Sequence, residues 1–351
     1  MRILHAANYN FDKDGARYFG WDHKVHQGLV QAGHYVYPFS ISDRARMLSP
    51  LCSRTGGLWA TNRKFIKCVE NLRPDLLVLG HSAHLSEKTI QHVRESFPQM
   101  KICLYYGDAI WSGRRVDYLQ AKLPFVDAVC ISTGGELLRP YCGPGRPAAF
   151  IPNSVEPSIE CHRAFECPTP DYDLVFFGTD KNLPERRKFL EDLRAGLPEF
   201  RFGFFGCMDQ RSVFGFERDI IMSRSRMALN LSRRNDVAMC SSDRIAHTTG
   251  NGLLTLNFQD GGLESLYGPE EIVYFQNIDD LIAKCRAYSQ NDTDWRHIAK
   301  NGWERAHRDY SSREVARFMV NLTFRDPAWR EAAWSDHIFW PAEERTSRAA
   351  A

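Results

Sequence analysis

The first half of the chain alternates short apolar runs with segments in which apolar residues recur at helical spacing. The apolar runs predict strands, and the segments between them predict helices. Strands are expected over residues 2–7, 35–41, 75–79, 101–106, 128–132 and 148–152. Helices are expected over 18–32, 62–72, 87–97 and 116–123, with a short one after residue 132. Near-continuous apolar strands separated by helices indicate a parallel sheet covered on both faces.

The alternation stops in a proline-containing stretch with little periodicity and then restarts, which indicates a linker between two domains. Further strands are expected over 173–177, 202–205, 227–231, 253–258 and 272–275. Further helices are expected over 185–195, 243–249, 279–289, 295–308 and 313–322. The predicted fold is α/β, with two Rossmann-like doubly wound domains that face a cleft and helices at the C-terminal end. The predicted divisions are 1–155, a linker over 156–171, a second domain over 172–325, and a partly disordered helix and tail over 326–351.

Composition and charge argue against nucleic-acid binding, membrane insertion and secretion. The 351 residues include 45 basic and 43 acidic side chains without a concentrated basic tract, which argues against nucleic acid. No apolar run reaches the roughly 18 residues of a membrane-spanning helix, and the N-terminal residues are too polar for a signal peptide. The ten cysteines form no C-x-x-C pair, and several lie within apolar strands. This pattern favours reduced thiols and a cytoplasmic location.

Several common catalytic motifs are missing from the sequence. It contains no P-loop, no G-x-G-x-x-G after the first strand, no H-E-x-x-H and no G-x-S-x-G. Three D-x-D triplets, which can bind a divalent ion, occur at Asp12/Asp14, Asp171/Asp173 and Asp292/Asp294. A chain of this acidity contains one or two such triplets by chance, so no metal site is predicted.

The segment 233–257 is the most informative for chemistry. Its polar loop ends at Ser241, Ser242 and Asp243, which open a short helix whose free N–H groups favour an anion. Arg244 lies in the first turn, where a cation opposes the helix dipole, so it faces either a ligand phosphate or a carboxylate of the protein. His247, three residues on, lies on the same helix face and is either a ligand contact or a satisfied helix histidine.

These residues belong to a larger set of motifs: Arg244-x-x-His247-x-x-x-x-Gly252-Leu253-Leu254-Thr255, Leu263-Glu264-x-Leu266-Tyr267 and EEIVYF at 270–275. The set resembles the C-terminal domain of GT-B glycosyltransferases, and more narrowly the group 1 type of CgeB-like spore-maturation and cell-envelope proteins. The resemblance covers roughly residues 171–320, whereas the first half fits only in its general pattern. It implies a nucleotide-sugar donor in the second domain and a glycan or glycolipid acceptor in the first. The implied donor-binding residues are Gly178, Lys181, Ser241, Ser242, Arg244, His247, Gly252 and Glu271.

One departure from the family pattern bears on the reaction. Many retaining members carry E-x7-E, which would place glutamates at 239 and 247, but this chain has Met239 and His247. Either His247 takes over the hydrogen bonds to the ribose hydroxyls, or the nucleotide binds differently. Without the first glutamate, the stereochemical outcome is open.

The resemblance also requires groups that neutralise the leaving diphosphate and a group that accepts a proton. Without a metal or another cofactor, Arg244, Lys181 and helix N-termini would carry the first task, although Lys181 could equally be a solvated loop residue. Candidate bases follow predicted strands, and each could instead cap a helix or anchor a loop. They are Asp108, favoured because Tyr106 and Trp111 could stack on a sugar, and then His81 and Asp14.

The expected function is therefore transfer of a sugar from a nucleotide-sugar to a glycan or glycolipid, in synthesis of bacterial envelope polysaccharide or lipopolysaccharide. Such an enzyme would act in the cytoplasm, either free or associated peripherally with the cytoplasmic face of the inner membrane. The alternatives are a nucleotide-sugar 2-epimerase on the same scaffold and a catalytically inactive nucleotide-sugar-binding protein. A nicotinamide enzyme is the least favoured alternative. The sequence does not indicate the sugar, the acceptor or the oligomeric state.

Overall fold

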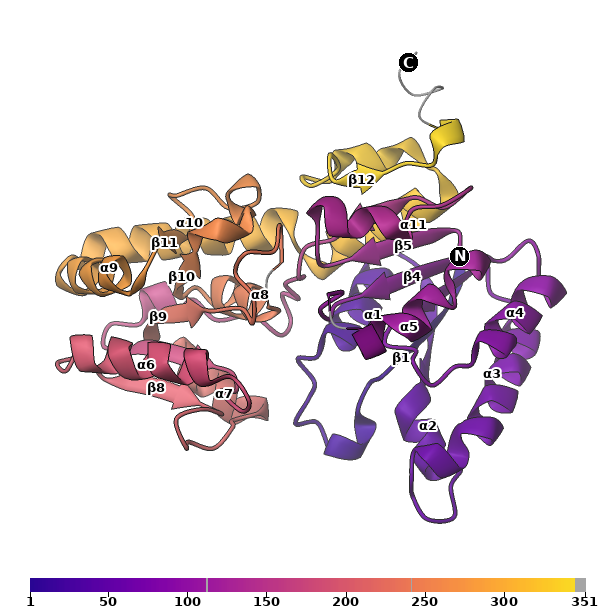
Figure 1. Ribbon diagram of the computed structural model, residues 1–351, viewed down its shortest axis with the longest axis horizontal. Helices are drawn as coiled ribbons and strands as arrows, with labels where there is room; N and C mark the ends of the chain where they lie inside the picture. The colour runs from indigo at the N-terminus through magenta and orange to yellow at the C-terminus, as the bar shows by residue number, and fades with distance from the viewer. Residues whose placement is uncertain (112, 241, 345–351) are drawn as a thin grey trace. The chain divides into compact units, whose positions relative to one another are not determined.

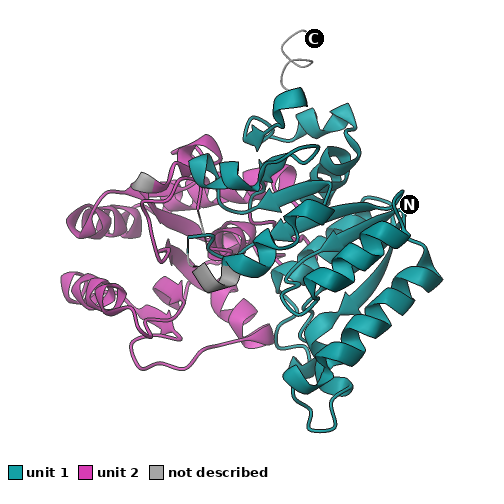
Figure 2. Cartoon of the chain, turned by 45° about the vertical axis from the view of Figure 1, so that its right-hand side comes forward, with its two compact units in different colours: residues 1–152, 312–351 teal, residues 153–311 magenta. Residues whose placement is uncertain are grey.

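The computed structural model describes residues 1–111, 113–240 and 242–344. The chain forms two compact units, unit 1 with residues Met1–Pro152 and Ser312–Ala351 and unit 2 with residues Asn153–Ser311 (Figures 1 and 2). Each unit is built around a parallel sheet with helices along its faces, which confirms the predicted α/β class and the two doubly wound halves. The part of the predicted tail over 345–351 lies outside the described residues.

Unit 1 contains a seven-stranded sheet with the order β12-β6-β5-β4-β3-β1-β2. All neighbours pair in parallel except β12, which is antiparallel to β6. Its strands are β1 (Arg2–Ala7), β2 (Tyr35–Ser40), β3 (Leu76–Leu79), β4 (Lys101–Tyr106), β5 (Ala128–Ile131), β6 (Ala148–Phe150) and β12 (Ile338–Phe339). Every residue of β3 and β5 is buried, which is why these strands are uniformly apolar.

The helices of unit 1 are α1 (Trp21–Gln31), α2 (Ile41–Met47), α3 (Leu58–Leu72), α4 (Glu87–Ser96), α5 (Gly113–Gln120) and α11 (Ser312–Phe324). Local signals fix several ends. Ser86 accepts a hydrogen bond from the Thr89 backbone at the start of α4, and Arg73 ends α3 with a φ of 45° just before Pro74. Shorter 3-10 helices cover Phe11–Lys13, Thr55–Gly57, Leu123–Phe125, Gly135–Tyr141 and Pro327–Glu331.

The last long helix, α11, packs on α1 and on strands β4 and β5 of unit 1. The sequence interpretation had grouped this segment with the second domain, because helices follow one another without interruption from residue 279 onwards. The chain thus leaves unit 1 after Pro152 and returns to it at Ser312. Near these crossings, the Val155 backbone N–H donates to the Tyr310 carbonyl over 2.9 Å.

We predict that Gly28→Ala lowers the free energy of unfolding by roughly 2 kcal/mol or more. A Cβ atom at Gly28 would lie 2.0 Å from the carbonyl oxygen of Ser312, so α1 and α11 would have to separate. The better helix propensity of alanine offsets only about 1 kcal/mol of this cost. Urea unfolding would measure the change, with Gln27→Ala at the neighbouring exposed position as the control. An equal midpoint for both variants would contradict the close helix contact.

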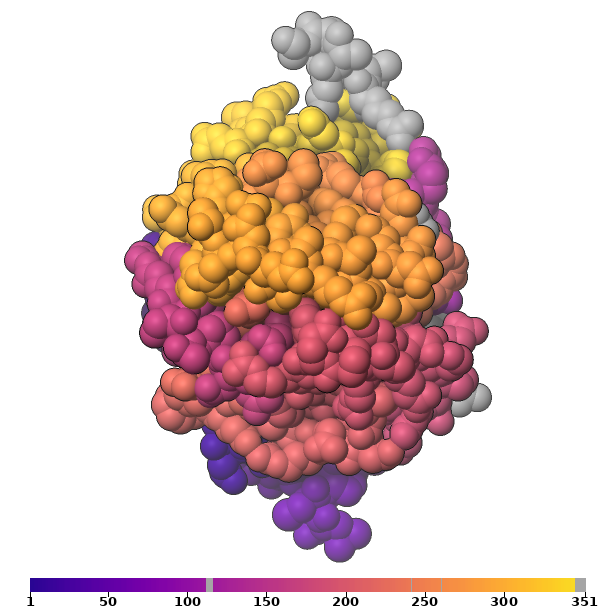
Figure 3. All heavy atoms as spheres, turned by 90° about the vertical axis from the view of Figure 1, so that its left-hand side faces the viewer, coloured from indigo at the N-terminus to yellow at the C-terminus, as the bar shows by residue number. Residues whose placement is uncertain are grey.

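Unit 2 contains a five-stranded parallel sheet with the order β11-β10-β9-β7-β8. Its strands are β7 (Tyr172–Phe177), β8 (Phe202–Phe205), β9 (Ser225–Asn230), β10 (Leu254–Phe258) and β11 (Val273–Phe275). Its helices are α6 (Pro184–Gly196), α7 (Gly215–Ser223), α8 (Arg244–Gly250), α9 (Ile278–Gln290) and α10 (Asp292–Asp309), with 3-10 turns over Ala164–Glu166, Gln259–Gly261 and Leu263–Ser265. In the space-filling view, the side chains of α9 and α10 form one continuous orange surface (Figure 3).

The D-x-D triplets of unit 2 have structural roles. Asp171 pairs with Arg224 and Asp173 with Arg201, while Asp292 accepts a hydrogen bond from the Trp295 indole. In the described part of the chain, no three His, Cys, Asp or Glu side chains are grouped so that they could hold a metal ion. All ten cysteines lie in this part, and none forms a disulfide there. Among the same residues, no helix is both long and apolar enough to span a bilayer.

Candidate functional site

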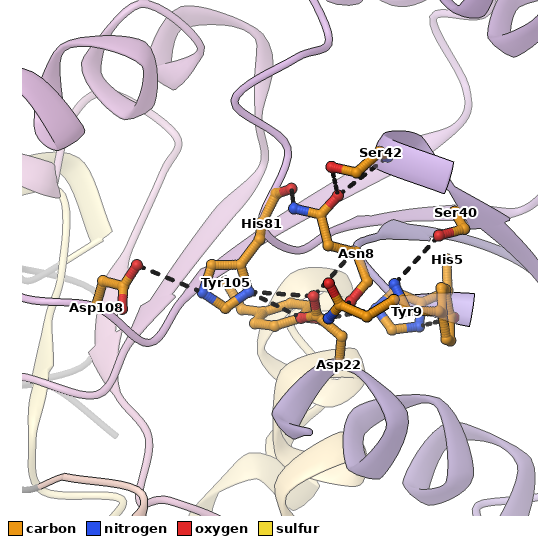
Figure 4. A network of polar contacts seen from close by, with 10 residues as sticks. His5, Asn8, Tyr9, Asp22, Ser40, Ser42, His81, Tyr105 and Asp108 are labelled. Atoms are coloured by element: carbon orange, nitrogen blue, oxygen red, sulfur yellow. Dashed lines mark hydrogen bonds and ion pairs between the residues drawn. The ribbon is translucent and has the colours of Figure 1, made fainter. Parts of the chain in front are cut away.

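Side chains that follow three neighbouring strands of unit 1 meet at the carboxyl edge of its sheet (Figure 4). Asn8 follows β1, His81 follows β3 and Asp108 follows β4. The Asn8 amide donates to the His81 carbonyl over 2.9 Å, and His81 Nε2 lies 3.9 Å from Asp108 Oδ2. Two of the three candidate bases are therefore together. Asp14 is not part of this group, because it lies exposed at the end of the 3-10 helix Phe11–Lys13 with a φ of 48°.

A buried carboxylate from α1, Asp22, holds this group in place (Figure 4). His81 Nδ1 lies 3.1 Å from both carboxylate oxygens, and the Tyr105 hydroxyl donates to one of them over 2.5 Å. The Asn8 backbone N–H donates to the other oxygen over 2.9 Å. Burial acts to raise the pKa of Asp22, but the charge and hydrogen bond of His81 outweigh it and lower the pKa to about 2. Asp22 is therefore ionised at neutral pH.

Behind Asp22, a buried chain of hydrogen bonds has a defined direction. Because the Tyr105 hydroxyl donates to Asp22, its oxygen accepts from His5 Nε2, 2.8 Å away. His5 Nδ1 then accepts from the Tyr9 hydroxyl over 2.6 Å, and the Tyr9 oxygen accepts from His26 Nδ1 over 3.0 Å. Each donor in this series of hydrogen bonds points towards the Asp22 carboxylate. By the same logic Asp22 takes the Nδ1 proton of His81, which leaves Nε2 as the basic nitrogen on the side of Asp108.

The buried His5 predicts a pH dependence of stability. Burial lowers the pKa of His5 to about 3, below the ordinary value of 6.5 expected in the unfolded chain. Below pH 6.5, His5 therefore binds a proton in the unfolded chain but not in the folded chain. As the pH falls from 6 to 4, the free energy of unfolding decreases by up to about 1.4 kcal/mol per pH unit. Urea titrations at several pH values should show a shallower dependence for His5→Gln. Identical slopes for the two proteins would contradict this explanation.

The aromatic residues next to Asp108 do not form an open surface for a sugar. The Tyr106 ring is buried and packs against the Tyr118 ring at a centroid distance of 6.1 Å. Tyr106 therefore belongs to the core of unit 1, which removes one of the two reasons for preferring Asp108 over His81. Trp111 remains half-buried.

Unit 2 has a pocket of about 420 Å³ at the carboxyl edge of its sheet. The pocket lies between the loops that follow β7 and β9, which are neighbours in the sheet although the chain runs from β7 to β8. This is the switch point, where doubly wound sheets bind ligands. The start of α6 and the loop after β9 line it with Asn182, Leu183, Pro184, Glu185, Arg186, Phe189, Leu231, Ser232, Arg233 and Asn235.

Arg244 does not line this pocket itself, but it contacts the lining residue Leu231 and is held by the ends of the two strands. Its Nε donates to the Phe177 carbonyl over 2.6 Å, and its Nη1 lies 3.3 Å from the Leu231 carbonyl oxygen. The guanidinium stacks on the Phe176 ring at 4.6 Å, and a side chain at Gly178 would come within 3.1 Å of Nη2. Burial, together with the charge of Arg186, lowers the pKa of Arg244 to about 10. Arg244 thus joins two strand ends and remains a buried cation.

Arg186 and Arg233 complete a group of three arginines. Arg186 donates to the carbonyl oxygens of Thr179 and Leu231 over 2.8 and 3.2 Å. Burial and the nearby charge of Arg233 lower the pKa of Arg186. In the described part of the chain, no carboxylate lies within 4.0 Å of any of the three guanidiniums. The sequence interpretation did not place Arg186 or Arg233 among the donor-binding residues. Arg186 lies in the first turn of α6, and Arg233 follows β9 by three residues.

The other residues expected at the donor site are distributed over unit 2. Lys181 is exposed in the loop between β7 and α6, and Ser242 Oγ lies 3.4 Å from the Arg244 backbone nitrogen. Gly252 and Glu271 come just before β10 and β11, so they lie at the amino edge of the sheet, opposite the pocket. Glu271 there accepts a hydrogen bond from the Gly268 backbone. Ser241 lies outside the described residues.

His247 is fully engaged within unit 2. Its Nδ1 lies 2.6 Å from Oε1 of the buried Glu160, and its Nε2 lies 3.6 Å from Asp243 Oδ2. The imidazole is buried on α8, which has only seven residues. This geometry is that of a histidine with protein partners, and it ties α8 to the segment that enters unit 2 after Pro152.

Residues 185–321, which include all three arginines of this group, match the profile of the glycosyl transferase-like family. No curated protein sequence matches the chain. The fold is similar to sucrose-phosphate synthase from Thermosynechococcus elongatus (15% identity, TM-score 0.61, 93% of this chain and 98% of that one). It is also similar to HepE from Anabaena in complex with UDP and glucose (10% identity, TM-score 0.57, 93% of this chain and 100% of that one). A third similar structure is a UDP-N-acetylglucosamine 2-epimerase (8% identity, TM-score 0.54, 94% of this chain and 98% of that one). The chain therefore has the GT-B fold, and residues 185–321 form a glycosyl transferase-like region within it.

Proposed function

We propose that the protein is a glycosyltransferase whose nucleotide-sugar donor binds in the pocket of unit 2. The observation that carries this proposal is the group of Arg186, Arg233 and Arg244, which has no carboxylate partner in the described part of the chain. A diphosphate supplies the two negative groups that such planar guanidiniums bind best. The glycosyl transferase-like region and the position at the switch point support the same ligand.

In the proposed reaction, the oxygen of an acceptor hydroxyl forms a bond to the anomeric carbon of the donor sugar. The bond from that carbon to the diphosphate oxygen breaks, and the nucleoside diphosphate leaves with the electron pair. His81 Nε2 takes the hydroxyl proton, because Asp22 holds the other ring nitrogen. The arginine group balances the charge that develops on the leaving diphosphate, so we propose that no metal or other cofactor is needed. A single displacement of this kind inverts the anomeric configuration.

For the acceptor, we propose a glycan or glycolipid of the bacterial envelope, such as a lipopolysaccharide precursor, with the enzyme acting in the cytoplasm. The support for the acceptor is the resemblance of the 244–275 motifs to cell-envelope members of the group 1 type. The support for the location is the set of ten cysteines, which form no disulfide in the described part of the chain.

Thermal unfolding with nucleoside diphosphates tests the donor site. A ligand that binds only the folded protein raises the Tm, so at least one of UDP, GDP and ADP should do so at millimolar concentration. Arg233→Ala should weaken that ligand about tenfold or more by removing a charged contact. Lys188→Ala is the matched control, because Lys188 is an exposed cation of α6 that pairs with Asp192. An equal loss in both variants, or no shift with any nucleotide, would contradict the site.

Incubation with nucleotide-sugars then separates the proposed transferase from the alternatives on the same scaffold. Transfer to an added acceptor supports the proposal. Conversion of UDP-N-acetylglucosamine to an epimer without acceptor would indicate a 2-epimerase. Binding without transfer, hydrolysis or epimerisation across a panel of nucleotide-sugars would indicate an inactive binding protein.

A further inference from the structure

The helical hairpin of α2 and α3 in unit 1, residues 41–72, carries three strongly exposed apolar side chains. Met47 is 81% exposed, Leu51 88% and Trp59 71%, all within thirteen consecutive residues. Single exposed apolar residues are common on protein surfaces, but a cluster this exposed marks an interaction site. We call these three residues the apolar tip. In Figure 1 the turn between α2 and α3 projects away from the rest of unit 1, while α3 itself packs beside the sheet.

Close helix packing and a hydrogen-bonded turn fix the shape of the hairpin and leave the apolar tip exposed to solvent. The position of Gly57 leaves no space for a side chain, since a Cβ there would lie 1.8 Å from the Ala45 carbonyl oxygen. Ser49 Oγ accepts from the backbone N–H groups of Leu51 and Ser53 over 3.4 and 3.2 Å, which closes the turn. Helix α3 turns Phe65 into the core and leaves the face of Trp59 and the residues one and two turns later to solvent.

Basic residues predominate in the sequence around the apolar tip. Residues 41–67 contain six basic side chains and one acidic side chain, although the whole chain has a net charge of only +2. Arg54, Arg63 and Lys64 have no carboxylate within 4.0 Å in the described part of the chain. The Arg63 guanidinium lies 4.7 Å from the centre of the Trp59 ring. Exposed apolar side chains that include an indole, together with cations in the same hairpin, match the interface of an anionic bilayer.

We propose that the α2–α3 hairpin docks unit 1 on a membrane surface that contains anionic lipids. Met47, Leu51 and Trp59 enter the headgroup region, and Arg54, Arg63 and Lys64 contact lipid phosphates. Three side chains bury too little area for a stable protein–protein interface, whereas shallow insertion combined with charge is sufficient for reversible membrane binding. This inference does not depend on the proposed sugar transfer, because it concerns a different surface.

Flotation of the full-length protein with lipid vesicles tests the proposal. The protein should float with vesicles of phosphatidylcholine and phosphatidylglycerol, and much less with phosphatidylcholine alone or in high salt. Leu51→Ser with Trp59→Ser should weaken binding about tenfold or more. Arg54→Ala with Lys64→Ala should weaken it about 25-fold on anionic vesicles only, at roughly fivefold per cation. Phe216→Ser on α7 is the matched control, because Phe216 is 73% exposed but lies in unit 2.

Three results would overturn the proposal. The first is no flotation of the wild type with anionic vesicles. The second is flotation that Leu51→Ser with Trp59→Ser leaves unchanged, or that Phe216→Ser reduces equally. The third is a dimer of the wild type in light scattering that the Leu51→Ser, Trp59→Ser variant abolishes, which would assign the apolar tip to a second copy of the chain. Circular dichroism melts of each variant test whether the fold is intact.

Discussion

Replacement of His81 by alanine should lower kcat for sugar transfer by about 10²–10⁴-fold, the usual contribution of a positioned base. Asp22 accepts the Nδ1 proton of His81, so Nε2 is the nitrogen that can take a proton from an acceptor. Nucleoside diphosphate affinity should stay within about twofold, because His81 lies in unit 1 and the arginine group in unit 2. Steady-state kinetics and thermal shifts with the same nucleotide measure the two effects separately.

Variants of the neighbouring carboxylates identify the base. Asp22→Asn should lower kcat much more than KM changes, because the amide no longer fixes the tautomer of His81. Asp108→Asn tests the carboxylate 3.9 Å from His81 Nε2, and Asp14→Asn is the control, because Asp14 lies exposed at the end of the 3-10 helix Phe11–Lys13. If Asp108→Asn abolishes transfer while His81→Ala retains it, Asp108 is the base and our assignment is wrong.

Replacement of Arg244 by alanine should weaken nucleoside diphosphate binding by about tenfold to 100-fold and also lower the Tm. The variant removes a buried cation next to the pocket, and hydrogen bonds to charged groups contribute about 1.5–3 kcal/mol each. It also leaves the carbonyl oxygens of Phe177 and Leu231 without this donor, so the ends of β7 and β9 lose a shared anchor. Calorimetric titration with nucleotide, paired with thermal melts, measures both losses.

Arg244→Lys distinguishes charge from anchoring. A lysine keeps the positive charge but cannot reach two strand ends as a planar guanidinium does. We therefore expect partial recovery of nucleotide affinity and little recovery of Tm. Unchanged affinity in Arg244→Ala would remove Arg244 from the donor site and reduce it to a structural residue of unit 2.

The sequence predicts most strands of the two sheets, but it does not predict the elements at their periphery. The predicted strand over 101–106 and the predicted strand over 202–205 coincide with β4 and β8, because buried parallel strands are marked by uninterrupted apolar runs. Helix α7 was not predicted, since Phe216 and Ile220 are exposed and the apolar residues form no simple buried stripe. Strand β12 has two residues and depends on pairing with β6, which no local pattern reveals.

The candidate site shows the same division between local and long-range information. His81 and Asp108 could be selected because each directly follows an apolar strand. Asp22 could not, because its role depends on contacts with Tyr105 and His81 that lie far away in the sequence. A helix position that looks ordinary in sequence is, in the folded unit, the acceptor at the end of a buried hydrogen-bond chain.

The return of the chain to unit 1 through α11 has a consequence for biosynthesis. Unit 2 is translated in full before α11 leaves the ribosome, so it can fold while the sheet of unit 1 still lacks the helix that covers β4 and β5. Phe318 and Met319 of α11 are buried in the finished protein. A nascent chain that stalls before Ser312 would therefore display apolar core surface to chaperones and proteases, although its amino-terminal strands are all present.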